Sequence, residues 1–414
     1  MNKKLIVWLA FLAALMLVAF ISWVIQLRDG LIVAHIRNPF SWGLYISTFA
    51  FLVGVAAGGL IVSSSVYIFK IEALKPLAST AALTAFVCVS GAGMMVIPDL
   101  GRPDRMLNLL LHPNFTSPLV WDIIVINCYA GLSLLYTYNL LLPGLVKRKS
   151  IFSFMMNKRP LEEVEKFSHR NAKILAPIAL PFAVLIHTIT AWVFATQASR
   201  PWWFSAIIAP DFIAVAVASG SALVLLVCVI AYGFKEDLKP AYHILAKLSA
   251  IALIVHLFFM YNDFMIRGWW QKPGEFDAMR LLFTDTLVPH LIEVVLPLIA
   301  SIIFFSNKLR SKPAVLLLGI ILMLIGAYSH RFLLMPSAYN FIPLSLHIAG
   351  SPELWAYPIS LGQVLPNQDV FVTHWAYVPS LIEISIAVGV LSVVAFMISV
   401  ALAIFPFRTA AQEK

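Results

Sequence analysis

Residues 43–70 read GLYISTFAFLVGVAAGGLIVSSSVYIFK, and the only charged side chain among them is that of Lys70 at the end. A helix of about 20 apolar residues crosses about 30 Å of lipid hydrocarbon, so this stretch is long enough to span a membrane. Similar stretches recur along the 414 residues, at approximately 5–27, 43–70, 76–98, 119–141, 174–197, 206–232, 244–266, 284–305, 313–333 and 379–405. The sequence therefore predicts an all-α integral membrane protein with ten transmembrane helices.

The overall composition excludes a soluble protein. Hydrophobic residues make up 61% of the chain and charged residues 12%, whereas soluble domains have about 45–50% and about 25%. An outer-membrane barrel is also excluded, because its strands would be short segments of alternating hydrophobicity. The first apolar run is longer than the core of a signal peptide, so we expect it to remain as an uncleaved helix.

The net charge of +9 comes mostly from connections on the N-terminal side of the predicted spans. The densest group lies in one connection and consists of Lys147, Arg148, Lys149, Lys158, Arg159, Lys166, Arg170 and Lys173. Basic loops stay in the cytoplasm, so this bias predicts that both termini are cytoplasmic. The basic residues are expected to meet anionic membrane lipid, and they indicate no nucleic-acid partner.

A carboxylate follows a proline by four residues at three places. The segments are Pro118-Leu-Val-Trp-Asp122, Pro289-His-Leu-Ile-Glu293 and Pro379-Ser-Leu-Ile-Glu383. Proline suits the first turn of a helix, so each acid is expected about one turn inside the membrane. Because the first two segments begin the fourth and the eighth spans, we expect two four-helix bundles, spans two to five and six to nine, flanked by spans one and ten. The corresponding regions are 1–39 (first flanking helix and outer loop), 40–200 (first bundle), 201–335 (second bundle), 336–378 (outer loop) and 379–414 (last helix and tail).

Ionisable residues inside the spans are the strongest functional signal. Each one costs about 2.5–3.5 kcal/mol at a helix centre, so each needs a partner or a role. They are Asp122, His187, Asp211, His256, Asp263, His290, Glu293, His330, Arg331 and Glu383, and the predicted topology places them in the outer half or near the midplane. Three of them could instead be interfacial residues that loops satisfy, namely Asp263, Arg331 and Glu383. Asp122 and Glu293 could compensate the helix dipole, and His187 and His256 could be structural.

The sequence argues against metal cofactors within this chain. Cys88, Cys128 and Cys228 all fall inside apolar spans, without the clustering of an iron–sulfur site. Only His187 and His256 have matching depth, which would allow one haem at most, and we expect no haem and no metal. A lipophilic ligand that exchanges protons fits the outer groups better. Quinol oxidation releases two protons, which histidine and aspartate can accept.

Several motifs resemble the NrfD/PsrC family, the integral membrane subunits of polysulfide-reductase-type respiratory complexes. They are Trp42-Gly-Leu-Tyr45, Asp99-Leu-Gly-Arg102-Pro103, Ser117-Pro-Leu-Val-Trp121-Asp122, His187-Thr-Ile-Thr190-Ala-Trp192 and Gln197-Ala-Ser-Arg200-Pro-Trp202. The resemblance extends over about residues 40–405. It implies a quinone-interacting anchor subunit in the cytoplasmic (inner) membrane of a prokaryote, within an oxidoreductase complex of anaerobic respiration. The chain would supply a quinone redox site, and other subunits would hold the catalytic cofactors.

The resemblance also implies partners and site residues. Menaquinone or ubiquinone would bind in the first bundle, and a ferredoxin-like iron–sulfur subunit on the outer face would connect it to a molybdopterin-type catalytic subunit. By motif position, the catalytic residues would be Asp122 and His187, and the quinone-binding residues Trp42, Tyr45, Asp99, Arg102, Trp121 and Thr190. Arg102 could alternatively anchor its loop through Asp99 or Asp104. Candidates for a proton route are Asp211, His256, Asp263, His290, Glu293, His330, Arg331 and Glu383.

Two other functions remain open at this point. A proton-coupled transporter would use the repeat and the carboxylates, and it would need a polar path to the inner face. A purely structural anchor would hold the iron–sulfur partner without binding a ligand.

Overall fold

A computed structural model describes residues 3–36, 40–153, 156, 159–341 and 376–407, together with 346–347, 350, 354–355, 357–358 and 371–372. Within these residues ten helical segments are long and apolar enough to cross a membrane, which confirms the predicted class. The long helices are α1 (Lys3–Asp29), α2 (Leu44–Ile68), α3 (Ala78–Asp99), α5 (Pro118–Lys147), α6 (Leu161–Ala195), α7 (Ile208–Tyr232), α8 (Lys239–Trp270), α10 (Leu287–Phe305), α12 (Pro313–Tyr339) and α13 (Leu381–Ile404).

Short elements connect the long helices. Three are short α-helices, α4 (Asn108–Leu111), α9 (Glu275–Leu282) and α11 (Asn307–Arg310). Five are 3₁₀ helices, at Leu31–Ala34, Glu72–Leu77, Pro103–Arg105, Ile151–Ser153 and Glu236–Leu238. Two antiparallel strand pairs are formed by β1 (Leu346–His347) with β2 (Leu354–Trp355) and by β3 (Tyr357–Pro358) with β4 (Phe371–Val372).

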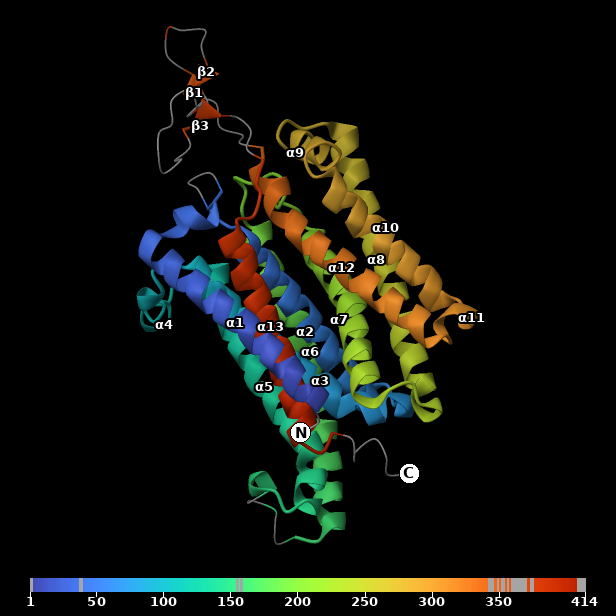
Figure 1. The fold of residues 1–414 in the computed structure, drawn as a ribbon. Coiled ribbons are helices and arrows are strands. Elements are labelled where there is room, and N and C mark those ends of the chain that lie inside the picture. Colours follow the sequence, from blue (N-terminus) through green and yellow to red (C-terminus); the bar gives the residue numbers. More distant parts are fainter. Residues whose placement is uncertain are drawn as a thin grey trace.

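The helices run between two ends of the molecule (Figure 1). The strands and α9 lie at one end, which we call the upper end. At the other, the lower end, α1 begins and α13 finishes. The predicted outer loop 336–378 lies largely outside the described residues, and its start needs correction because α12 continues to Tyr339.

Helix α2 is the centre of the fold, because it packs against α3 and α6 on one side and against α7 and α12 on the other. Its crossing with α7 is made by two glycines: a Cβ added to Gly58 would lie 2.3 Å from the Cα of Gly220. Small residues let membrane helices meet at backbone contact. The glycine-rich segment of α2 therefore joins the two halves of the chain.

The first and last spans pack against each other beside this assembly. A Cβ added to Gly389 on α13 would lie 2.0 Å from the Cβ of Ala19 on α1, and Ser385 donates a hydrogen bond to Ser22 at 2.7 Å. Helices α2, α3, α5 and α6 pack together, as do α7, α8, α10 and α12. Their origin by duplication stays a prediction.

The fifth span is longer than its apolar segment. Helix α6 has 35 residues, which corresponds to about 52 Å, well beyond about 30 Å of hydrocarbon. Its first turns carry charged side chains such as Glu162 and Glu163. The helix therefore extends out of the membrane at the lower end, where hydropathy alone placed its start at residue 174.

Candidate functional site

Asp122 and Thr190 form a buried pair in the first bundle. Pro118 begins α5, so Asp122 lies in the first turns of that helix with 5% of its surface exposed. Its Oδ1 accepts a hydrogen bond from Thr190 Oγ1 at 2.6 Å. Thr190 Oγ1 also lies 2.7 Å from the Ile186 carbonyl oxygen, so its single proton is shared between two acceptors. The structure thus brings together one predicted catalytic residue and one predicted binding residue.

His187 lies one turn before Thr190 on α6 and is 2% exposed. Among the described residues, neither of its ring nitrogens has a hydrogen-bond partner. Its ring lies beside the Gly54 backbone on α2 and within electrostatic reach of Arg331 on α12. Buried polar atoms in proteins nearly always have partners. These two nitrogens therefore mark a place where a ligand or an ordered water can bind.

Arg331 is the second buried group at this place. It is 1% exposed; its Nη2 donates to the Phe212 carbonyl oxygen at 3.2 Å, and its guanidinium carbon lies 3.8 Å from the centre of the Phe212 ring. Its Nη1 has no partner within the described part of the chain. A Cβ at Gly54 would lie 3.8 Å from the Arg331 guanidinium. Glycine at this position therefore leaves room beside the arginine.

Tyr45 and Asp99 belong to a different buried group. Tyr45 donates to the Gln26 side-chain oxygen, and the Gln26 amide donates to the Pro98 carbonyl oxygen at 2.7 Å. Asp99 follows on α3, and its Oδ1 is buried without a partner among the described residues. Sequence reasoning missed Gln26, although a glutamine inside the apolar run of α1 is a detectable signal.

Three of the predicted quinone-binding residues, Trp42, Trp121 and Arg102, lie outside the two buried groups described above. The Trp42 ring packs against Phe194 and Trp203, with ring centres 5.8 and 5.7 Å apart. Trp121 is 45% exposed and donates to the Phe115 carbonyl oxygen at 2.8 Å.

Arg102 is exposed and holds Asp104 through hydrogen bonds of 2.9 and 2.8 Å, the contact that the loop-anchoring alternative named, and its quinone-binding role stays a prediction. These hydrogen bonds lower the pKa of the Asp104 carboxyl.

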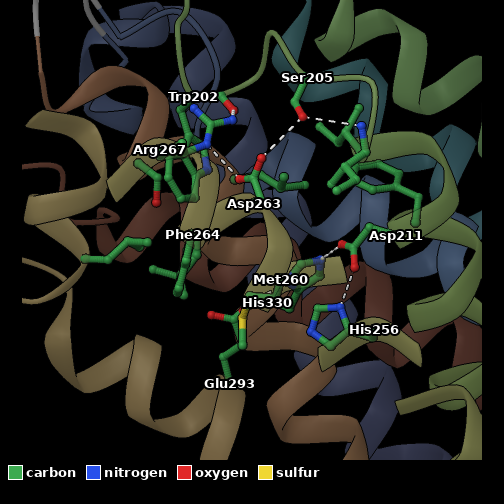
Figure 2. Close-up of a pocket in the computed structure, with 17 residues that line it drawn as sticks. Trp202, Ser205, Asp211, His256, Met260, Asp263, Phe264, Arg267, Glu293 and His330 are labelled. Atoms are coloured by element: carbon green, nitrogen blue, oxygen red, sulfur yellow. Dashed lines mark hydrogen bonds and ion pairs between the residues drawn. The ribbon is translucent and has the colours of Figure 1, made fainter. Parts of the chain in front are cut away.

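The second bundle contains five ionisable residues that form one continuous chain, which we call the His–carboxylate chain. It runs His256, Asp211, His330, Glu293, His290, and every member is buried or nearly so. The successive nitrogen–oxygen distances are 2.6, 3.3, 2.5 and 3.1 Å. The 3.3 Å link between His330 Nε2 and Asp211 is an ion-pair contact, and this nitrogen makes no hydrogen bond within the described residues. Figure 2 shows the part around Asp211. Four helices, α7, α8, α10 and α12, each supply at least one member.

Both carboxylates of the His–carboxylate chain have imidazole partners. Each carboxylate contacts two imidazoles, one through each oxygen, so neither acid is buried without a partner. Imidazole changes its charge near neutral pH and can pass a proton from one nitrogen to the other. Three of the ligating atoms, from Asp211, His256 and His330, lie within 4.8 Å of one another, a spacing that a metal ion also accepts. The expected absence of a metal stays a prediction.

A cavity of about 80 Å³ adjoins the chain and is large enough for a few water molecules. Asp263 and Arg267 line it and form an ion pair at 2.7 Å (Figure 2). Ser205 donates to Asp263 at 3.3 Å, and Arg267 also donates to the Pro201 and Trp202 carbonyl oxygens. Sequence reasoning missed Arg267, which lies four residues after Asp263 and therefore on the same helix face.

Glu383 does not join this chain. It caps α13 by accepting from the Ser380 backbone at 2.9 Å, and it accepts from Tyr377 Oη at 2.5 Å. Gly43 allows this approach, because a Cβ there would lie 2.5 Å from both side chains. Burial and the Glu383 carboxylate raise the pKa of Tyr377. Glu383 thus caps its own helix, and its place on a proton route stays a prediction.

Comparison with known proteins identifies a family. The model of the polysulphide reductase NrfD family matches residues 33–343. A protein of Halobacterium salinarum, provisionally named as a membrane subunit of dimethyl sulfoxide reductase, is 31% identical over 98% of this chain and 92% of its own length. A selenate reductase subunit of Mesobacillus selenatarsenatis is 26% identical over 98% and 95%. The Hdr-like menaquinol oxidoreductase integral membrane subunit of Archaeoglobus fulgidus is 26% identical over 66% and 62%.

Proposed function

This chain belongs to the NrfD polysulphide reductase family, and on that premise we propose that it is the quinone-interacting membrane subunit of a respiratory oxidoreductase complex. Its ten spans make it a multi-pass membrane protein. Its similarity to subunits of reductase complexes extends over nearly the whole chain, and one further relative is named for menaquinol. We take menaquinone or ubiquinone as the ligand.

The observation that carries the proposal is the pair of unpartnered nitrogens on buried His187. Their chemistry fits a quinone head group, whose oxygens accept hydrogen bonds when oxidised and donate them when reduced. The neighbouring Arg331 Nη1 is a further donor without a partner in the described residues. Gly54 leaves space beside it. Bound quinol supplies two electrons and two protons.

The residues around this place have separate roles. An imidazole nitrogen of His187 accepts a hydrogen bond and then a proton from the ligand. Arg331 contributes positive charge and a donor, which orients a ring oxygen. Thr190 lies three residues after His187, on the same face of α6, and its hydrogen bond positions the carboxylate of Asp122 on α5. Burial of all these groups excludes bulk water from the proton transfer.

The test compares two kinds of turnover in the purified complex. His187→Gln and Asp122→Asn should lower quinol-linked turnover at least tenfold, because neither replacement can exchange a proton. Activity with an artificial dye, which bypasses the membrane subunit, should not change. Thr188→Val is the matched control, since Thr188 donates to the Val184 carbonyl oxygen on a more exposed side of α6. Unchanged quinol-linked turnover in both variants would remove the site assignment.

We further propose that the His–carboxylate chain moves protons to the upper end. His330, the middle member of the chain, directly precedes Arg331 on α12, so the proposed quinone site adjoins the middle of the chain. The cavity next to Asp211 connects it to the Asp263–Arg267 pair near the end of α8. Alternating acids and imidazoles, with room for water, are what proton relays consist of.

The partners and the orientation also remain proposals. We place a ferredoxin-like iron–sulfur subunit at the upper end, near the proposed quinone site, and a molybdopterin-type catalytic subunit beyond it. The basic connection between α5 and α6 puts the lower end in the prokaryotic cytoplasm. The test introduces single cysteines into a chain without native cysteines and labels them with a thiol reagent that does not cross the membrane. Labelling of Ala376→Cys in intact cells, and of Lys149→Cys only after lysis, would support this orientation. The reverse pattern would overturn it.

A further inference from the structure

A cavity of about 520 Å³ lies at the lower end, on the opposite side of the membrane from the proposed quinone site. It forms where α2 and α5 finish and where α3 and α6 begin. Its polar lining consists of Tyr67, Lys75, Ser79, Lys147, Glu165, Lys166, Ser168 and His169. None of these residues takes part in the function proposed above.

The lining favours an anion. The lining carries three lysines, Lys75, Lys147 and Lys166. Among the described residues that line the cavity, Glu165 is the only acid. Two of the lysines also contact acids outside the cavity: Lys166 lies 2.6 Å from Glu162, and Lys75 lies 3.9 Å from Glu72. These pairs are exposed and therefore weak. They leave Lys75 and Lys166 available to turn towards a bound anion.

A buried hydroxyl points to a specific ligand. Ser79 is 3% exposed, and its Oγ has no hydrogen-bond partner among the described residues. It lies in the first turn of α3, which has 22 residues and begins at Ala78. Phosphate oxygens accept hydrogen bonds from hydroxyls as well as from ammonium groups.

One apolar groove adjoins the cavity, and a second groove adjoins the first. One, of about 430 Å³, lies between α3, α5 and α13 and shares Leu141 with the cavity. The other, of about 320 Å³, lies between α5 and α6 and shares Tyr138 with the first groove. A charged pocket at the end of membrane helices, with an apolar groove leading from it along α5, has the form of a lipid, with a phosphate head group and an apolar tail.

We propose that this cavity binds an anionic phospholipid, with its phosphate between Lys75, Lys147 and Ser79 and its apolar tail along the groove between α3, α5 and α13. Basic pockets between helices at the cytoplasmic surface bind such head groups. The occupant would connect α3, α5 and α6, which carry Asp99, Asp122 and His187. The site thus ties the lower ends of the helices that form the proposed quinone site, although its test is independent of quinone.

The experiment uses the full-length protein, purified in detergent and freed of lipid. Phosphatidylglycerol and phosphatidylcholine of the same chain length are titrated, and bound lipid is counted by native mass spectrometry. Phosphatidylglycerol should bind more tightly. The variant Lys75→Gln/Lys147→Gln should weaken its binding about 25-fold, since each basic residue near a lipid surface accounts for about fivefold. Lys235→Gln/Lys308→Gln is the control, because both lysines lie outside the cavity.

The other arms separate the alternatives. Ser79→Ala should weaken phosphatidylglycerol binding by about tenfold or more without changing the fold, because it removes one hydrogen bond to a charged group. Millimolar inorganic phosphate should not displace the lipid. Displacement by phosphate would show a soluble anion site and overturn the proposal. Equal affinity for the two lipids, or equal loss in the control variant, would also overturn it.

Discussion

His330 on α12 lies with its Nδ1 2.5 Å from Glu293 Oε1 on α10, so that an imidazole joins two helices of the second bundle. The other nitrogen of the same ring lies 3.3 Å from Asp211 on α7. A single side chain therefore bridges two buried carboxylates. Without it each carboxylate would have one imidazole instead of two, and the proposed path would be interrupted where it meets the proposed quinone site.

The proton role of this bridge predicts a selective loss. His330→Gln keeps a polar side chain of similar length but cannot carry a proton, so quinol-linked turnover should fall at least tenfold while dye-linked activity stays constant. His290→Gln, at the end of the chain, should have a smaller effect. Turnover measured in the purified complex checks both. An equal effect of the two variants would contradict a directional relay.

The glycine crossing between α2 and α7 predicts a loss of stability. A Cβ at Gly58 would lie 2.3 Å from Gly220, so Gly58→Ala must push the helices apart and should cost about 1–3 kcal/mol. The detergent-solubilised protein should unfold at a lower temperature. Gly131→Ala on α5 is the control, because nothing lies within 4 Å of the added Cβ. It should be neutral or slightly stabilising, and a similar drop in both variants would refute the packing argument.

The contact between Tyr377 and Glu383 predicts a pH dependence. The pKa of Tyr377 is raised above its ordinary value of 10.0, because burial and the neighbouring carboxylate disfavour the phenolate. Its contribution to stability is therefore full below pH 10 and is lost as the pH rises further. Unfolding temperatures of the wild type should fall more steeply above pH 10 than those of Tyr377→Phe. Parallel curves would show that the phenol is not linked to folding.

The capping box formed by Ser380 and Glu383 at the start of α13 predicts a loss of stability when Ser380 is replaced. Ser380→Ala deletes the side chain that accepts from the Glu383 backbone at 3.1 Å, and loss of a helix N-cap costs about 0.5–2 kcal/mol. Thermal unfolding should occur earlier, with quinol-linked turnover unchanged at lower temperature. A loss of turnover without a loss of stability would return Glu383 to the group of functional acids.

The spans could be predicted from the sequence, since they follow from the high free energy of charge in hydrocarbon. Which groups meet could not be predicted. Asp211 and His330 contact each other because of how α7 and α12 are rotated about their axes, and helix periodicity alone does not fix that rotation between helices. Glu383 has the same spacing after proline as Glu293, yet it caps its own helix because Gly43 and Tyr377 approach it. Arg102 faces outwards because it forms its ion pair with Asp104, two residues later, and not with Asp99.

The most direct test of the central claim is a binding titration of the purified full-length protein with a fluorescent quinone analogue. The wild-type protein should bind one molecule, and His187→Gln should weaken binding by tenfold or more, whereas Thr188→Val should bind normally. Equal affinity in all three proteins, or no saturable binding to the wild type, would contradict a quinone site at His187.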